Sequence, residues 1–195
     1  MSGTGELRFD CGSPCLDLVA TRTGHPPQEQ LDAPARLRAW LQGAALVPDT
    51  APLDVRPDWL TAFLALRATL EHLLAAQLGG ETPAPADLAA LNAAARAEPV
   101  VPVAVRQDDG TLARALAAPP TCDALLAAVA RDAVDLFTDP VARARLRVCE
   151  GENCTLVYVD TSRGRRRRWC SSEICGNRER VARHRRRTAP RTVRN

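Results

Sequence analysis

Two six-residue stretches, CEGENC at residues 149–154 and CSSEIC at residues 170–175, decide the fold of the C-terminal end. Each stretch begins and ends with cysteine, so four thiols come in two pairs. Structural zinc sites take four tetrahedral ligands, commonly thiolates, and leave no position for water or substrate. A tight turn inside each stretch can place both sulfurs on one side of the ion. We therefore predict a structural zinc site made of Cys149, Cys154, Cys170 and Cys175.

Disulfides, unrelated free thiols and an iron–sulfur cluster are the alternatives to zinc at these four cysteines. The first ten residues are polar and do not resemble a signal peptide, so we expect a cytoplasmic protein with reduced thiols. Paired spacing then favours a metal over two disulfides or four unrelated thiols. An iron–sulfur cluster is the remaining alternative, because the same ligands can hold it. Cys11, Cys15 and Cys122 lack a second pair, and we expect them to be small buried apolar residues.

A longer pattern surrounds the four cysteines. It consists of Arg147-Val148-Cys149, Cys154, Asp160-Thr161-Ser162-Arg163, Arg168-Trp169-Cys170-Ser171 and Cys175-Gly176-Asn177-Arg178. In this order and spacing the residues resemble the CGNR-type zinc fingers over about a quarter of the chain. The resemblance implies a bacterial transcription regulator whose finger is expected to bind DNA.

The N-terminal end carries a second, shorter resemblance. Residues 15–21, CLDLVAT, look like the opening of the alanine-rich domain called ABATE, which precedes CGNR fingers. That opening usually has Leu-Asp-Phe followed by Asn-Thr, whereas here Leu18 stands for the Phe and Ala20 for the Asn. The pair of resemblances implies a stress-related role in transcription.

The charge is distributed very unevenly along the 195 residues. Residues 143–195 hold 16 Arg and 5 acids, a balance of +11, while residues 1–142 hold 10 Arg and 18 acids, a balance of −8. The sum is the net charge of +3. So concentrated a positive block favours a polyanionic partner, most commonly nucleic acid. We expect an ABATE-like domain at 1–142, a finger at 143–188 and a disordered basic tail at 189–195.

Apolar periodicity predicts an α+β fold that is mostly helical. Residues 15–21 form either a short helix or a buried strand. Strands are expected at 102–106, 111–116 and 156–159, the first two forming a β-hairpin. Helices are expected at residues 34–46, 57–79 and 85–97, from Thr121 onward, at 141–148 and at 173–187. The order of elements after residue 148 is that of a treble-clef-like finger, in which Gly151 would relieve the first turn with a positive φ.

The arginines of the finger divide into two groups when the last helix is laid out at about 100° per residue. Arg178 shares the side of Cys175, so we expect Arg178, with Gly176 and Asn177, to shape the finger and to bond loop carbonyls or shield the sulfurs. The arginines expected to contact nucleic acid are Arg180, Arg183 and Arg187 on the opposite side, and Arg165, Arg166 and Arg167 in the preceding loop.

The sequence thus predicts a zinc-dependent, DNA-binding transcription regulator. An RNA-binding or ribosome-associated protein and a zinc-stabilised protein-interaction module are the alternatives. The sequence contains no glycine-rich phosphate loop, zinc-protease motif or paired nucleophile and base, so we do not expect an enzyme. No apolar run reaches the length of a membrane span. A small-molecule effector or protein partner for the N-terminal domain, and a homodimer, are left open.

Overall fold

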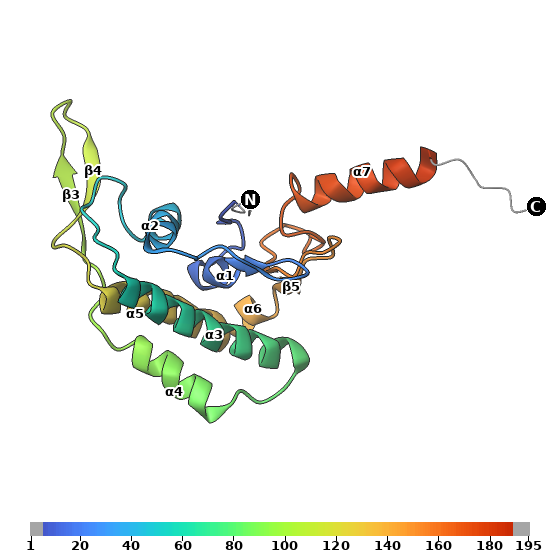
Figure 1. Cartoon of the computed structure of the whole chain (residues 1–195), viewed down its shortest axis with the longest axis horizontal. Coiled ribbons are helices and arrows are strands. Elements are labelled where there is room, and N and C mark those ends of the chain that lie inside the picture. Colours follow the sequence, from blue (N-terminus) through green and yellow to red (C-terminus); the bar gives the residue numbers. More distant parts are fainter. Residues whose placement is uncertain (1–5, 189–195) are drawn as a thin grey trace, which may run out of the picture.

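The computed structural model describes residues 6–188, with side chains described as far as residue 186 (Figure 1). The part described consists of helices and three two-stranded antiparallel sheets, followed by a helix that projects from the body. The mostly helical α+β fold predicted from the sequence is confirmed. The expected tail at 189–195 lies outside the described residues.

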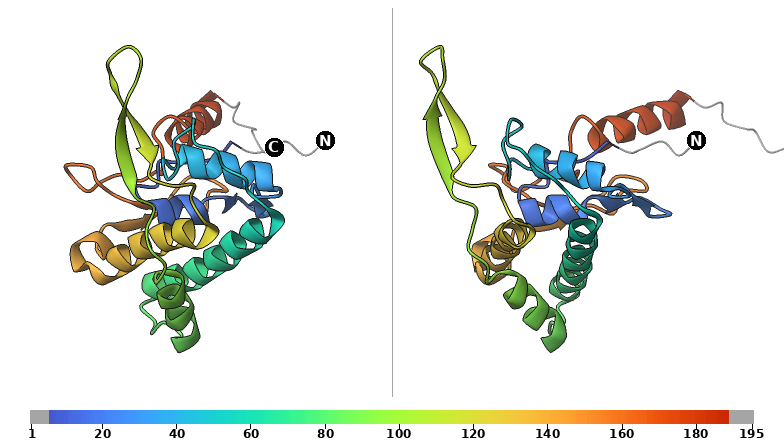
Figure 2. Two further views of the ribbon diagram at one scale, coloured as in Figure 1. Left: turned by 90° about the vertical axis from the view of Figure 1, so that its left-hand side faces the viewer. Right: turned by 60° about the vertical axis from the view of Figure 1, so that its left-hand side comes forward.

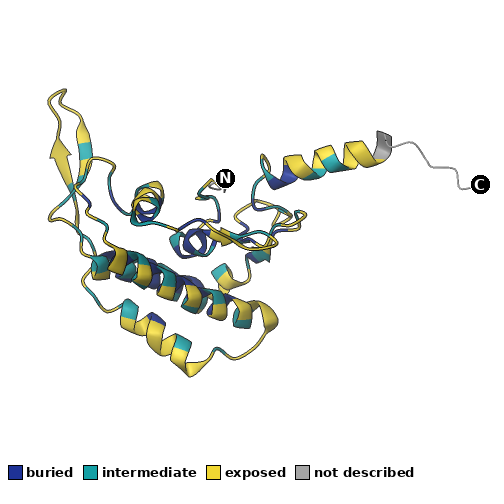
Figure 3. Cartoon of the chain, viewed as in Figure 1, coloured by how far each residue is buried: buried dark blue, intermediate teal, exposed yellow. Residues whose placement is uncertain are grey.

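Three helices form the centre of the N-terminal part: α1 (Pro14–Val19), α3 (Pro57–Gly79) and α5 (Cys122–Thr138). All three pack on one another, and Figure 3 shows buried residues along the facing sides of α3 and α5. Residues 15–21, left open between helix and strand, begin in α1. Their apolar side chains are buried because α1 is inserted between longer helices.

Two further helices cover this centre. Helix α4 (Pro85–Ala94) packs against α3 and α5, and α2 (Pro34–Gly43) packs against α3 (Figure 2). The fully buried Trp40 of α2 meets Phe63 of α3 edge to face, with ring centroids 6.0 Å apart. The Trp40 indole N–H also donates to the carbonyl of Asp17 at 3.3 Å, so its one polar atom is satisfied inside the core.

The helix boundaries follow the local signals in the sequence. Proline occupies the first turn of α2, α3 and α4, where its missing N–H has no intrahelical partner to lose. The Thr121 hydroxyl accepts from the Ala124 N–H at 3.2 Å and caps α5 as predicted. Helix α3 ends at Gly80, which adopts a left-handed φ of 70°.

The predicted β-hairpin is present as β3 (Pro102–Arg106) and β4 (Leu112–Leu116), with Pro102 opposite Leu116. It projects from the body on the side away from the last helix (Figures 1 and 2). A second, very short hairpin was not predicted: β1 (Arg22–Thr23) pairs with β2 (Gln28–Glu29). Two-residue strands are too short to give a periodic signal.

The helix predicted at 141–148 is wrong for its second half. Helix α6 (Pro140–Arg143) is only one turn long, and β5 (Leu146–Val148) follows it and pairs with β6 (Val157–Val159). The backbone of Asp160 also donates to the carbonyl of Arg145 at 2.8 Å, which extends the pairing. Strand pairing with residues 9 to 13 positions later outweighs the local helical pattern, and a short segment cannot reveal this.

The C-terminal module is packed onto the N-terminal part and shares its core. Leu156, Tyr158 and Val159 belong to the same cluster of buried side chains as α1 and α3. The N–H of Val159 donates to the carbonyl of Cys11 at 2.8 Å, so the segment before α1 lies beside β6. Helix α7 (Cys175–Thr188) then extends outward (Figure 1). Within residues 6–188, no helix has both the length and the apolar character needed to cross a membrane.

The end of α3 offers a matched pair of substitutions that tests the fold. Gly80→Ala should lower the free energy of unfolding by about 1 kcal/mol, because an L side chain is strained at φ 70°. Gly79→Ala should raise it by up to about 1 kcal/mol, because alanine favours the helix and the added Cβ meets only Glu81 at 3.6 Å. Urea denaturation of both variants measures the difference, and equal effects would contradict the left-handed end.

Candidate metal centre

The four cysteines that we predict to bind zinc bring their sulfur atoms close together. The sulfur atoms of Cys149, Cys154, Cys170 and Cys175 all lie within 4.8 Å of one another. The Cys154–Cys170 and Cys170–Cys175 Sγ distances are 3.8 and 3.5 Å. A tetrahedral zinc ion with bonds of about 2.3 Å needs sulfur–sulfur edges of about 3.8 Å. The four sulfurs therefore fit a zinc ion with little movement, and all four coordination positions are taken by protein.

The first turn of the site is shaped by close approach rather than by glycine's conformational freedom. Gly151 was expected to take a positive φ, but Asn153 has it, at 58°. Gly151 is needed for space, since a Cβ there would lie 3.0 Å from the Cβ of Cys175 and 3.2 Å from its sulfur. The N–H of Cys154 donates to the Gly151 carbonyl at 3.0 Å and closes the turn.

The second turn leads directly into α7. The Ser171 hydroxyl accepts from the N–H groups of Glu173 at 3.2 Å and Ile174 at 3.3 Å, and the helix begins at Cys175. The last ligand therefore lies in the first turn of α7, as predicted. This turn lies beside Trp169, since a Cβ on Gly176 would be in van der Waals contact with the indole ring at 3.4 Å. Binding of zinc by Cys175 thus fixes the position of the whole helix.

The sulfurs differ in how far their surroundings favour a thiolate: burial raises the pKa of Cys175 to about 12, whereas the pKa of Cys170 is lowered. The backbone N–H groups of Cys170 and Gly151 point at the Cys149 sulfur at 3.3 and 3.4 Å. The pKa of Cys170 is lowered to about 5, first because the Cys154 thiol hydrogen-bonds to it, with further help from neighbouring thiols and Arg8. The pKa of Cys154 is raised, first because of its hydrogen bond with Cys170. Binding of a metal by these thiols is therefore expected to release protons.

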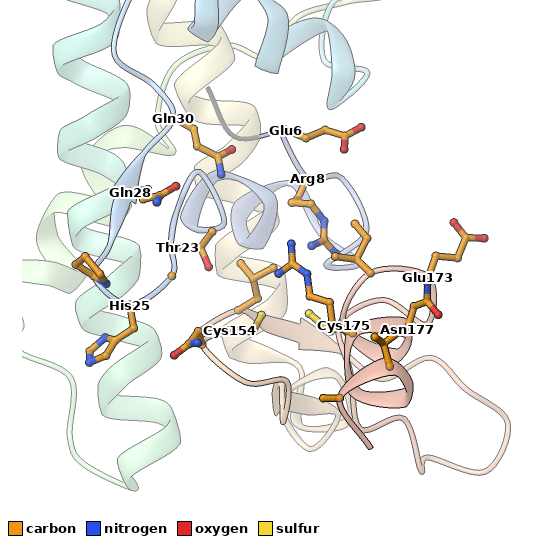
Figure 4. Close-up of a pocket in the computed structure, with 18 of the residues that line it drawn as sticks. Glu6, Arg8, Thr23, His25, Gln28, Gln30, Cys154, Glu173, Cys175 and Asn177 are labelled. Carbon is orange, nitrogen blue, oxygen red and sulfur yellow. The ribbon is translucent and has the colours of Figure 1, made fainter. Parts of the chain in front are cut away.

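Arg8 reaches the site from the N-terminal part (Figure 4), and no sequence motif indicates this role. Its guanidinium lies 3.6 Å from the Cys170 sulfur and binds the Asp10 carboxylate through two N–H groups at 3.1 and 2.7 Å. Only 12% of the Arg8 side chain is exposed. The metal centre is therefore not confined to the finger, since a guanidinium from the other part, itself paired with Asp10, contacts one ligand sulfur.

Two arginines lie in surroundings that differ from those expected. Arg167, expected to face nucleic acid, is half-buried: its guanidinium donates to the Trp169 carbonyl at 2.8 Å and to the Cys170 carbonyl. It also lies over the Tyr158 ring at 4.6 Å. The side chain of Arg178, expected to make such bonds, is exposed and has no hydrogen-bond partner among the residues described. The Trp169 and Cys170 carbonyls are instead within reach of Arg167.

The other basic residues lie on the surface. Arg165 and Arg166 are exposed in the loop, and Arg180 and Arg183 are exposed on α7. Arg180 donates to the Ser172 carbonyl at 3.2 Å, which holds it near the first turn. Figure 3 shows that most of α7 beyond its first turn is exposed. The side chain of Arg187 lies outside the described residues.

Removing one ligand should release the metal. Cys154→Ser should lose the one zinc ion expected per chain and the defined environment of Trp169, because structural zinc supplies about 10 kcal/mol or more of folding free energy. Metal content and near-ultraviolet circular dichroism measure both effects. Cys122→Ser is the matched control, since Cys122 lies in α5 outside the cluster. Zinc retained by the Cys154 variant would contradict the site.

Arg8 should tune zinc affinity although it is not a ligand. Arg8→Ala should weaken zinc binding by about 10- to 100-fold, the usual effect of removing a group that supports a metal ligand. Arg8→Lys should restore part of the loss, because it keeps the charge. Competition with a chromophoric chelator measures the affinity, and Arg56→Ala, which removes an exposed arginine paired with Asp58, is the control. Equal affinities in all four proteins would show that Arg8 does not act on the site.

Comparison with known families agrees with this geometry. The family model for ABATE, described as "Putative stress-induced transcription regulator", matches residues 12–140, and the model for the CGNR zinc finger matches residues 145–188. No curated protein matches the chain. The first match covers more than half of the sequence, and the second contains all four cysteines. The chain therefore belongs to the ABATE family and carries a CGNR zinc finger after its ABATE domain.

Proposed function

We propose that this protein regulates transcription by binding DNA through the basic surface of its zinc finger. The observation that carries the proposal is the projecting helix α7, whose exposed arginines have few acids around them. The only acid in α7 is Glu179, which pairs with Arg186 at 3.8 Å. Arg180 and Arg183 are then left as exposed cations on the side opposite Cys175.

The size of α7 suits a nucleic-acid groove. Its 14 residues span about 21 Å at 1.5 Å per residue, and the major groove of duplex DNA admits an α-helix. The zinc site holds the first turn of α7 against the finger, while the rest of the helix is exposed. A helix held at one end can enter the groove without moving the body of the protein.

The loop before the second turn adds a second group of cations. Arg165 and Arg166 are exposed there, and Arg168 pairs with Glu150 through its guanidinium at 2.6 Å. Cations at two separate places can contact phosphates on both sides of a groove. Such contacts set the position of the protein on the duplex, and base contacts must provide sequence preference. The proposed role is therefore that of a DNA-binding regulator of the stress response, with phosphate contacts from α7 and this loop.

The binding test uses two exposed arginines of α7 that do not contact the four cysteines. Arg180→Ala with Arg183→Ala should weaken duplex binding and make the slope of log affinity against log salt less negative by about 2, one unit for each lost phosphate contact. Fluorescence anisotropy at several salt concentrations measures both quantities. Zinc content should be unchanged, because neither residue touches the four cysteines.

A control variant with the same change in net charge distinguishes a direct phosphate contact of α7 from an effect of the protein's overall charge. Arg56→Ala with Arg106→Ala removes two exposed arginines from the N-terminal part. It should leave the salt slope unchanged. If both double variants bind alike, α7 does not contact the duplex. If structured RNA binds more tightly than duplex DNA, the RNA-binding alternative replaces this proposal.

A further inference from the structure

The β3–β4 hairpin projects from the body and exposes apolar side chains (Figures 1 and 2). The exposed fraction is 58% for Val101 at its base, 42% for Val105 and 74% for Leu112. Two antiparallel strands alone are marginally stable in water, whereas three or more strands with an apolar face are stable. A further strand beside this hairpin would therefore stabilise it.

The outer edge of β3 offers backbone groups for such a strand. The N–H of Gln107 donates to the Thr111 carbonyl at 2.8 Å, so the odd-numbered residues of β3 direct their N–H and C=O groups at β4. Ala104 and Arg106 direct theirs away from β4, and within residues 6–188 these groups have no other backbone partner. A row of unpaired groups of this kind is a template for pairing with another chain.

Charge limits what can pair with this hairpin. Arg106 and Arg114 are balanced by Asp108 and Asp109 in the turn, so the hairpin does not attract a polyanion such as nucleic acid. The edge of β4 is also unsuited to a second copy, because antiparallel pairing about the centre of Leu112–Leu116 would place Arg114 directly opposite its own copy. The Arg114 guanidinium is moreover bonded to the carbonyl of Ala45 at 2.8 Å.

Strand β3 matches a second copy of itself. In antiparallel pairing about Ala104, this residue faces its own copy and Val103 faces Val105 of the other chain. Arg106 faces Pro102, whose carbonyl can accept from the Arg106 N–H. The two copies of Arg106 would lie at least about 14 Å apart, at about 3.4 Å per residue, which is beyond the screening length of about 10 Å at 0.1 M salt. No like charges then face each other, and the valines of the two chains form one continuous apolar surface.

We propose that β3 pairs with β3 of a second copy of this chain across a two-fold axis, so that the two hairpins form one four-stranded antiparallel sheet. The pairing does not rest on the proposed DNA binding, because the hairpin and α7 lie on opposite sides of the body (Figure 1). One strand edge buries less than the about 800 Å² per partner of a standard interface. The dimer is therefore reversible, with a dissociation constant on the order of 10 µM.

Sedimentation velocity of the zinc-loaded full chain, without nucleic acid, tests the proposal. The sedimentation coefficient should rise from that of a monomer to that of a dimer between about 1 µM and about 500 µM, concentrations on either side of the expected dissociation constant. A chain that remains a monomer at about 500 µM would overturn the proposal, and the hairpin would then be open to a strand of another protein.

Opposite charges at position 104 test the register. Ala104→Asp and Ala104→Lys should each weaken the dimer by about 10-fold or more, because each places like charges directly opposite one another at the two-fold axis. An equimolar mixture of the two variants should associate about as tightly as the unchanged chain. This recovery would also show that both variants are folded, which zinc content and far-ultraviolet circular dichroism check independently.

The matched control places the same charges on the other strand. Leu112→Asp and Leu112→Lys change an exposed side chain of β4, away from the proposed axis, and each should dimerise alone as the unchanged chain does. If the mixture of the two position-104 variants associates no better than either variant alone, β3 does not face its own copy. If all four variants dimerise alike, the dimer forms through another surface and the proposal is wrong.

Discussion

The arrangement of the C-terminal part depends on one interaction, the convergence of four cysteine sulfurs on one point. Two of these sulfurs come from a turn after β5, and two come from the turn that starts α7. Without a cation between them, four sulfurs at this distance repel one another as soon as they ionise. When zinc is bound, the thiolates coordinate it, and this coordination connects the β5–β6 strand pair to α7. The direction of α7 therefore follows from the coordination of Cys175.

The N-terminal part contributes to this centre as a folded neighbour. Arg8 lies beside the sulfur of Cys170, and the N–H of Val159 donates to the carbonyl of Cys11. The hydroxyls of Thr23 and Thr155 lie 3.3 Å apart. These contacts explain why the finger shares its buried side chains with the helices. They also connect the surface of α7 that we propose to contact DNA with the N-terminal part.

The features of the structure that depend on local residue types could be predicted from the sequence. Cysteine spacing located the metal site, and the cap at Thr121 and the left-handed Gly80 follow from residue type. The predictions were wrong where contacts between residues far apart in the sequence determine the structure. The strand at 146–148 exists because β6 pairs with it, and Arg167 is half-buried because two carbonyls near Cys170 attract its guanidinium. Arg8 stands in a polar segment with no motif, so only the folded chain shows its contact with Cys170.

Zinc X-ray absorption spectroscopy of the purified full chain tests the tetrathiolate zinc centre. We predict that four sulfurs surround the zinc at about 2.3 Å, with no nitrogen or oxygen ligand. A shell that includes nitrogen or oxygen at about 2.0–2.1 Å, or a purified chain whose four thiols are oxidised and hold no metal, would contradict it.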